Sequence, residues 1–229
     1  PKEFEQLPQP LRQEAVRPYF DSLNQKRATL LWKRFFDLFI SFFVLLLLSP
    51  ILLVAACMVK FTSKGPVFYK QVRVGALGRE FRILKFRTMV VNADKIGAQI
   101  TVGENDPRIT KVGKVLRVTR VDEFPQLINV LKGDMSLVGT RPEVPRYVRE
   151  YEPAMYATLL LPPGITGEAS IQFRHENEML ASAEEDPEEF YIRTVLPQKM
   201  QYNLHYLEQL SIGRDLSLLL RTVGCVFQR

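Results

Sequence analysis

A long apolar run near the N-terminus limits what this chain can fold into. Residues 38–59 read LFISFFVLLLLSPILLVAACMV, and only Ser41, Ser49 and Pro50 interrupt the run. A helix of about 20 apolar residues is long enough to span a bilayer. Roughly 37 residues precede the run and no small-residue cleavage site is evident, so a signal peptide fits poorly. The run therefore predicts a segment embedded in a membrane.

The middle of the run favours a segment that turns back over a straight span. Ser49-Pro50 falls there, and proline kinks or breaks a helix because it lacks a backbone donor and clashes with the preceding turn. Each arm around this pair has about 10 to 12 residues, or roughly 18 Å of helix. That is too short for a hydrocarbon core of about 30 Å.

Basic residues on both flanks of the run point the same way. The positive-inside rule would put both ends on the cytoplasmic face. These residues are Lys26, Arg27, Lys33 and Arg34 before the run, and Lys60, Lys64, Lys70 and Arg73 after it. We therefore expect a re-entrant helix-break-helix, with an ordinary kinked transmembrane helix as the alternative. At the start of the run, Asp37 is expected to pair with Arg34, one helical turn earlier.

The remaining sequence predicts an α+β fold. The 229 residues suffice for one sizeable core and a smaller appendage. We expect a polar lead-in over residues 1–30, the re-entrant helix over 31–62, and a small mixed domain over 63–229. The domain's predicted elements are a β-hairpin over 64–89 around Gly75–Gly78, loop and short helix over 90–114, a helix over 124–132 ended by Gly133, a helix over 143–161, a rigid turn over 161–167, and helices from Asp186 onward broken near Pro197 and Gly213. The last helical pattern is either core or rests on the membrane surface.

The charge of the chain indicates an anionic partner. The formal net charge is +6, which suits nucleic acid, anionic lipid or phosphorylated small molecules. The sequence contains no P-loop, no GxGxxG after a strand and no aromatic-rich RNA motif. The 2 cysteines and 2 histidines show no zinc-type spacing. We therefore expect no nucleic-acid partner, although a basic membrane-tethered nucleic-acid binder is one alternative.

The adjacent carboxylates of Asp122 and Glu123, in the stretch RVDEFPQL, allow two interpretations. Asp is a favoured N-cap and Glu is favoured in a first helical turn, so the pair could simply begin a helix. It could also be a catalytic pair. The two interpretations are compatible, because a helix N-terminus lowers the pKa of a carboxylate and would keep Asp122 ionised, as a nucleophile must be.

Several cations lie beside turn or β-rich apolar sequence, which sets them apart from the ordinary solvated lysines and arginines. Arginine's planar fork suits bidentate contacts with phosphate. These candidates are Lys85, Arg87, Arg117, Arg120, Arg141 and Arg174.

The order of motifs resembles the bacterial sugar transferase family, the monotopic phosphoglycosyl transferases of surface-glycan assembly. The likeness runs from about residue 31 to the C-terminus. The most specific stretch is RVDEFPQLINVLKGDMSLVGTRPE; the others are KRFFDL…LSPILL, GPVFYKQVRVG, FRILKFRTM, LPPGITG and DLSLLLRT. The resemblance favours the catalytic interpretation of Asp122 and Glu123.

The resemblance implies transfer of a phosphosugar from a UDP-sugar to a polyprenol phosphate, usually undecaprenyl phosphate, with release of UMP. Asp122 matches the nucleophile that forms an acyl-phosphate intermediate. Glu123 matches a neighbouring acid that either deprotonates the polyprenol phosphate or steadies the site. Mg²⁺ is the family's metal, held by Asp122 and the diphosphate. Such chemistry depends mainly on positioning and on neutralising charge.

Other residues acquire expected roles from the same resemblance. Arg117 and Arg141 match phosphate-binding arginines, Arg174 matches another by spacing, and Lys85 and Arg87 are added as substrate-binding candidates. Ser49 and Pro50 match the helix-break pair of the membrane anchor. Thr140, Glu168 and Phe173 depart from the family's pattern, which leaves the sugar open between a HexNAc and glucose or galactose.

The expected setting is the bacterial inner membrane. The anchor would be monotopic, with the active site on the cytoplasmic face and downstream glycosyltransferases using the product. The chain resembles the minimal, single-domain form of the family, and its exposed apolar surface would permit a homodimer. The functional alternative is a non-catalytic membrane-surface scaffold of a glycan assembly complex, against which the presence of Asp122, Glu123 and Arg117 argues.

Overall fold

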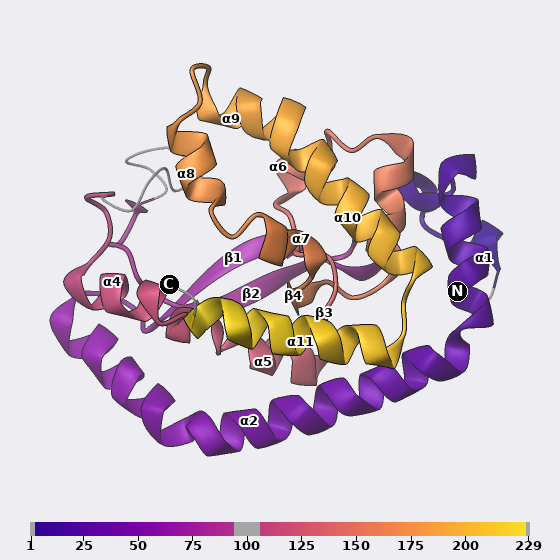
Figure 1. Cartoon of the computed structure of the whole chain (residues 1–229). Coiled ribbons are helices and arrows are strands. Elements are labelled where there is room, and N and C mark those ends of the chain that lie inside the picture. The colour runs from indigo at the N-terminus through magenta and orange to yellow at the C-terminus, as the bar shows by residue number, and fades with distance from the viewer. Residues whose placement is uncertain (1–2, 94–105, 228–229) are drawn as a thin grey trace.

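The computed structural model describes residues 3–93 and 106–227 (Figure 1). Its α-helices are α1 (Arg17–Gln25), α2 (Arg27–Thr62), α4 (Lys111–Val118), α5 (Gln126–Lys132), α6 (Pro145–Val148), α7 (Glu168–Gln172), α8 (Glu176–Ala181), α9 (Pro187–Phe190), α10 (Leu196–Glu208) and α11 (Ile212–Phe227). Its strands are β1 (Phe68–Val74), β2 (Glu80–Phe86), β3 (Ser136–Val138) and β4 (Gly164–Thr166). Short 3-10 helices are η1 (Phe4–Gln6), η2 (Gln9–Leu11), η3 (Glu14–Val16), η4 (Ala76–Gly78), η5 (Val121–Glu123) and η6 (Pro153–Leu160), and η7 (Tyr191–Val195) is a π-helix. The mixed α and β content agrees with the predicted fold class.

Two small sheets form the middle of the molecule. Strands β1 and β2 form the predicted antiparallel hairpin, with Phe68 opposite Phe86. Strands β3 and β4 pair in parallel, with Ser136 opposite Gly164. The prediction of a simple rigid turn over 161–167 missed β4. A Cβ atom on Gly164 would lie 2.1 Å from the backbone nitrogen of Gly139, so this close pairing requires glycine.

Helix α2 is bent but continuous, so the predicted break into two separate helices is not confirmed. It begins at Arg27 and contains Pro50. Pro50 has no N–H to donate to the carbonyl of Leu46, four residues earlier, and the Ser49 hydroxyl donates to that carbonyl instead, at 2.8 Å. The α2 ribbon changes direction along its length (Figure 1). Proline is the usual cause of such a bend.

Both halves of α2 pack against the same domain. In the first half, Lys33, Asp37 and Ser41 are buried at successive turns. In the second half, Ala55 and Val59 pack in a cluster with the side chains of β2 and α4. Most other large side chains of α2 are apolar and exposed. Only 11% of the most apolar stretch of the helix is buried inside the protein. By length and composition α2 could cross a membrane.

A buried polar network joins α2 to the domain. Lys33 Nζ donates to Asp215 Oδ2 at 2.6 Å and to the Val138 carbonyl at 2.8 Å. Tyr206 donates its hydroxyl to the other oxygen of Asp215 at 2.7 Å. These contacts connect α2, β3, α10 and α11 at one point.

The predicted pair between Arg34 and Asp37 is wrong, because each side chain has partners in the domain. Asp37 accepts from the Ser136 hydroxyl at 2.7 Å and from the Leu137 amide at 3.1 Å. Arg34 donates to the Val130 carbonyl at 2.8 Å, at the end of α5. Both residues therefore help to attach α2 to the domain.

The N-terminal segment belongs to the main hydrophobic core. It forms three 3-10 helices and α1, and its apolar side chains pack with those of α10 and η6. The buried members are Phe4, Leu7, Leu11, Val16, Phe20 and Leu23.

Prolines changed two of the predicted helices. The predicted helix over 143–161 is divided into α6 and the 3-10 helix η6, which begins at Pro153. The predicted break near Pro197 is a change of helix type, because the π-helix η7 ends at Val195 and α10 begins at Leu196, with Pro197 in its first turn, where proline is tolerated. The predicted helix over 124–132 is confirmed as α5, and Gly133 ends it with a φ of 96°. Of the region 90–114, residues 94–105 lie outside the described residues.

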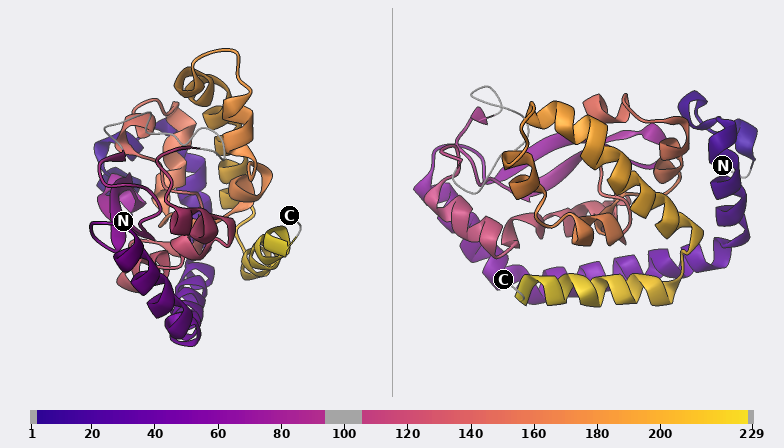
Figure 2. Two further views of the ribbon diagram at one scale, coloured as in Figure 1. Left: turned by 90° about the vertical axis from the view of Figure 1, so that its left-hand side faces the viewer. Right: turned by 45° about the horizontal axis from the view of Figure 1, so that its top comes forward.

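Helix α11 presents two different faces. Asp215 and Leu218 are buried, whereas Leu216, Leu220 and Val223 are exposed. The helix lies alongside α2 (Figure 2), to which the Lys33–Asp215 pair bonds it. Its exposed apolar face therefore adjoins the apolar helix.

The ion pair of Lys33 should contribute strongly to stability. The Lys33→Met variant leaves Asp215 buried and without its cation, which typically costs about 3–5 kcal/mol of unfolding free energy. Denaturation of the detergent-solubilised protein, followed by circular dichroism, measures this loss. The double variant Lys33→Met/Asp215→Asn removes both charges and keeps an acceptor for Tyr206, so it should recover much of the loss. Equal losses in the single and double variants would contradict this role of the pair.

Candidate active site

The turn that carries Asp122 and Glu123 is not the start of helix α5. The residues form the single 3-10 turn η5, which follows Arg120 in a left-handed conformation with a φ of 58°. Helix α5 begins only at Gln126, and its N-cap position is Pro125. No side-chain capping bond is present at η5 or α5. The interpretation of the pair as a helix cap is therefore wrong.

Glu123 is held between two cations from different parts of the chain. Its Oε1 accepts from Lys85 Nζ of β2 at 2.8 Å and from Arg141 Nη2, after β3, at 2.6 Å. Burial alone would raise the pKa of Glu123, but Arg141 and Lys85 outweigh it and hold the pKa well below the usual value. A carboxylate with so low a pKa is a poor proton acceptor near neutral pH. Of its two expected roles, the geometry favours steadying the site.

Asp122 has the opposite surroundings. It is buried, and its Oδ1 has no hydrogen-bond partner among the described residues. Burial and the neighbouring charge of Glu123 raise the pKa of Asp122 to about 6, although Lys85, Arg117 and Arg120 act in the other direction. The expectation that a helix N-terminus lowers this pKa is therefore wrong. At neutral pH the group is still mostly ionised, with an oxygen available to another partner.

Arg117 reaches this pair from α4. The helix is capped by Thr110, whose hydroxyl accepts from the Gly113 amide at 2.9 Å. A Cβ atom on Gly113 would lie 2.0 Å from the Thr88 carbonyl oxygen, so glycine allows α4 to lie against the segment that follows β2. The Arg117 Nε then donates to the Thr88 hydroxyl at 2.9 Å. The positive charge of Arg117 lowers the pKa of Asp122, which places the guanidinium within electrostatic reach.

The structure brings together Asp122, Glu123, Lys85, Arg117 and Arg141, but not Arg87. Arg87 is buried at the end of α2, where its guanidinium donates to the carbonyls of Ser63 at 2.8 Å and Lys64 at 2.7 Å. These contacts satisfy carbonyls at the C-terminus of a helix and leave Arg87 away from the carboxylates. Its expected phosphate-binding role has no support in this geometry.

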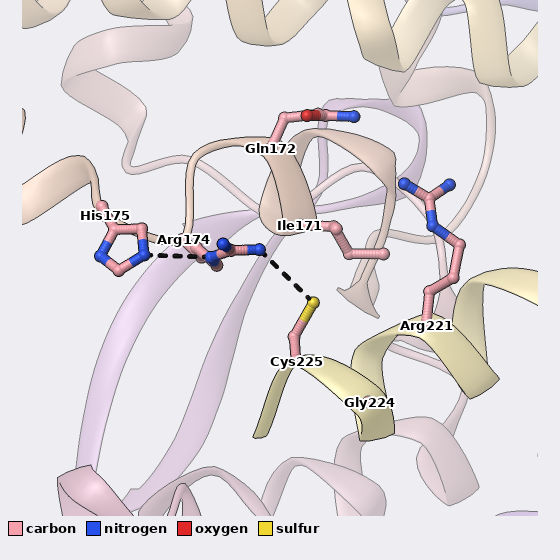
Figure 3. Close-up of a pocket in the computed structure, with 7 residues that line it drawn as sticks. All are labelled: Ile171, Gln172, Arg174, His175, Arg221, Gly224 and Cys225. Atoms are coloured by element: carbon pink, nitrogen blue, oxygen red, sulfur yellow. Dashed lines mark hydrogen bonds between the residues drawn. The ribbon is translucent and has the colours of Figure 1, made fainter. Parts of the chain in front are cut away.

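Arg174 lies in a separate cleft between α7 and α11 (Figure 3). Its Nε donates to His175 Nε2 at 3.0 Å, and no contact joins it to Asp122 or Glu123 among the described residues. The cleft of about 440 Å³ is lined by Ile171, Gln172, Arg174, His175, Arg221, Gly224 and Cys225.

A buried network positions the loop that carries Arg141. Glu143 accepts from the Tyr191 hydroxyl at 2.7 Å and from Lys199 Nζ at 3.3 Å. Arg73 donates to the Pro142 carbonyl at 2.9 Å. The sequence reasoning missed these residues. Glu143 follows Arg141-Pro142 directly, but nothing local connects it to helices some 50 residues later.

The donor set fits a magnesium ion only if other ligands complete the shell. The described residues contain no group of three or more His, Cys, Asp or Glu side chains that could hold a metal. Mg²⁺ commonly binds one or two carboxylates together with substrate phosphates. The buried, unpartnered Oδ1 of Asp122 is the oxygen that suits such an ion.

Comparison with known proteins gives the family. The family described as bacterial sugar transferase matches residues 28–229. The chain belongs to this family. That result confirms the resemblance seen in the motifs and makes the site of Asp122 the place to look for sugar-transferase chemistry.

Several curated relatives of this sugar transferase are named for phosphosugar transfer. It is 41% identical over 215 residues to a UDP-glucose:undecaprenyl-phosphate glucose-1-phosphate transferase of Klebsiella pneumoniae, covering 91% of this chain and 42% of that protein. It is 36% identical to a UDP-N-acetylgalactosamine-undecaprenyl-phosphate N-acetylgalactosaminephosphotransferase of Aeromonas hydrophila, covering 85% and 43%. It is 32% identical to the exopolysaccharide production protein ExoY of Sinorhizobium fredii, covering 85% and 84%. The chain thus spans about two fifths of the length of the first two relatives.

The raised pKa of Asp122 predicts a pH-dependent gain in stability for the Asp122→Asn variant of this sugar transferase. The ordinary value is 3.8 and the folded value is about 6, so the charged carboxylate costs the folded state about 3 kcal/mol above pH 6. Below about pH 4 the group is protonated in both states and the cost disappears. The variant should therefore be more stable than wild type at pH 8, with a gain that shrinks from pH 6 to pH 4. Urea denaturation in EDTA at several pH values tests this, and a gain that does not vary with pH would contradict the raised pKa.

Proposed function

We propose that this sugar transferase moves a phosphosugar from a UDP-sugar to a polyprenyl phosphate such as undecaprenyl phosphate, with release of UMP. The observation that carries the proposal is the buried Asp122 with an unpartnered oxygen, beside two cations that Glu123 holds in place. The names of the relatives support the same class of donor and acceptor. The product would be a lipid-linked diphosphosugar, a suitable acceptor for downstream glycosyltransferases of surface-glycan assembly.

Asp122 is the proposed nucleophile. Its carboxylate oxygen forms a bond to the β-phosphorus of the UDP-sugar, the bond from that phosphorus to the bridging oxygen breaks, and UMP leaves with the electron pair. A phosphate oxygen of the lipid then attacks the same phosphorus, and the bond to Asp122 breaks to restore the carboxylate. Burial favours this role, because few hydrogen bonds stabilise the carboxylate before it reacts.

The cations have separate proposed roles. Lys85 and Arg141 lie against Glu123 and would bind the phosphoryl oxygens as negative charge moves through the site. Arg117 would contact phosphate from the α4 side. When bound, Mg²⁺ would be held by Asp122 and the substrate diphosphate and would neutralise the charge between them. The partly buried ion pairs would keep Lys85 and Arg141 fixed before substrate arrives.

A test of the reaction measures UMP release from a panel of UDP-sugars, which includes glucose, galactose and N-acetylhexosamine donors. Wild type should release UMP when undecaprenyl phosphate and Mg²⁺ are both present, and Asp122→Asn should lose at least about a thousandfold because its amide is a poor nucleophile. The matched control is Asp21→Asn, which changes an exposed aspartate of α1. Full activity in Asp122→Asn would remove the nucleophile assignment. No release by wild type with any donor would favour the scaffold alternative.

We also propose that α2 is a re-entrant anchor. Its first half bonds to β3 and α11, and its second half packs on β2 and α4, so both ends meet the same domain. A domain folded on one side of a bilayer cannot contact both ends of a straight span. The bent helix would dip into one leaflet, with the active site at the cytoplasmic interface.

Cysteine labelling tests this anchor. In a Cys57→Ser/Cys225→Ser background, Asp21→Cys and Lys64→Cys should react with a membrane-impermeant maleimide from the same face, because both ends of α2 return to it. Leu47→Cys, within the apolar run, is the control that should react only after the membrane is dissolved. Labelling of the first two positions from opposite faces would exclude the anchor.

A further inference from the structure

The cleft between α7 and α11 combines charge and apolar surface in one place. Arg174 and Arg221 stand on opposite sides, with Ile171 and Cys225 between them (Figure 3). Arg221 donates Nη1 to Glu168 at 3.1 Å, whereas Arg174 forms no ion pair with a carboxylate of the described residues. Such a cleft suits a ligand with an anionic end and an apolar body.

The apolar continuation of the cleft lies on α11. Leu216, Leu220 and Val223 follow one another at helical spacing and are 55%, 65% and 57% exposed. The same helix supplies Arg221, Gly224 and Cys225 to the cleft. Since α11 runs beside the apolar helix α2, this stripe adjoins the surface that would meet lipid (Figure 2). The charged end and the apolar stripe therefore share one element and one side of the molecule.

Strand β4 links this cleft to the carboxylates. Arg141 Nη1 donates to the Ile165 carbonyl at 3.4 Å, and the hydroxyls of Thr166 and Thr222 lie 2.8 Å apart. The contacts to Arg141 and to α11 are thus made by adjacent residues of one strand. Glu176 follows the cleft residue His175, and its negative charge helps to raise the pKa of Arg141. Strand β4 thus connects the helix that lines the cleft with the arginine that bonds to Glu123.

We propose that this cleft holds the phosphate end of the polyprenyl phosphate acceptor, with the prenyl chain along Leu216, Leu220 and Val223. This assignment rests on the proposed function. Arg174 and Arg221 would bind the phosphate, and the apolar stripe would bind the first prenyl units. The donor diphosphate would occupy the cations around Glu123, so each substrate would approach Asp122 from its own side.

Two glycines of α11 provide a matched test. A Cβ atom added at Gly224 or at Gly213 meets nothing within 4 Å, so the backbone at both positions has room for a side chain to begin. Both also gain helix propensity when glycine is replaced. Only Gly224 lines the cleft, so Gly224→Phe should fill it and Gly213→Phe should not.

The experiment measures KM for undecaprenyl phosphate in nanodiscs of neutral lipid. Gly224→Phe and Arg174→Gln should each raise this KM about tenfold or more, which corresponds to a loss of about 1.4 kcal/mol of binding. Gly213→Phe should match wild type. The burst of UMP from the UDP-sugar in the absence of acceptor should also match wild type in Gly213→Phe, because residue 213 does not line the cleft.

The outcomes separate this inference from the proposed function. Wild type without UMP release would refute the function itself. Active variants with an unchanged KM for undecaprenyl phosphate would overturn the inference but not the proposed function. A rise in the KM for the UDP-sugar would also overturn it, because the cleft would then bind the donor. A variant defect that disappears when anionic phospholipid is added would assign the arginines to general membrane binding and also overturn it.

Discussion

The buried ion pair between Lys33 and Asp215 is the contact on which the arrangement of this sugar transferase depends. It joins α2 and α11, and the same two side chains bond to the Val138 carbonyl of β3 and the Tyr206 hydroxyl of α10. Isolated buried charges would cost several kcal/mol each, so the pair is stable only when all these partners are in place. The requirement fixes an apolar helix against the strand that precedes Arg141. Helix α2 is thereby part of the framework of the candidate active site.

Two adjacent carboxylates have opposite properties because their partners differ. Lys85 and Arg141 both bond to Glu123, which keeps that group ionised and its oxygens engaged. Asp122, one residue earlier, is buried beside these cations without bonding to them through Oδ1. If the cations bonded to Asp122 directly, the oxygen needed for attack would be occupied. Glu123 thus allows positive charge near Asp122, the proposed nucleophile, and leaves the Asp122 oxygen available, a separation of properties that resembles that of paired catalytic acids.

Local sequence predicted the elements that depend on local chemistry. The hairpin follows from β-rich runs around a glycine turn, and α5 ends at Gly133 because only a residue that accepts a positive φ fits there. Long-range contacts decided the rest. Strands β3 and β4 are short and far apart in sequence, so no periodicity reveals their pairing. Lys85 and Arg87 are two residues apart, yet one bonds to Glu123 and the other to the end of α2. The raised pKa of Asp122 likewise comes from burial, which the motif alone does not report.

The bend of α2 connects this apolar helix to the candidate active site through a short series of contacts. Proline makes the bend but would leave the Leu46 carbonyl unpaired in an apolar setting, where an unsatisfied backbone group costs several kcal/mol. The Ser49 hydroxyl bonds to that carbonyl, so the Ser-Pro pair works as one unit. The second half of α2 then returns to pack Ala55 and Val59 against Leu116 of α4. Because α4 also carries Arg117, the direction of the helix after the bend determines where that guanidinium stands relative to Asp122.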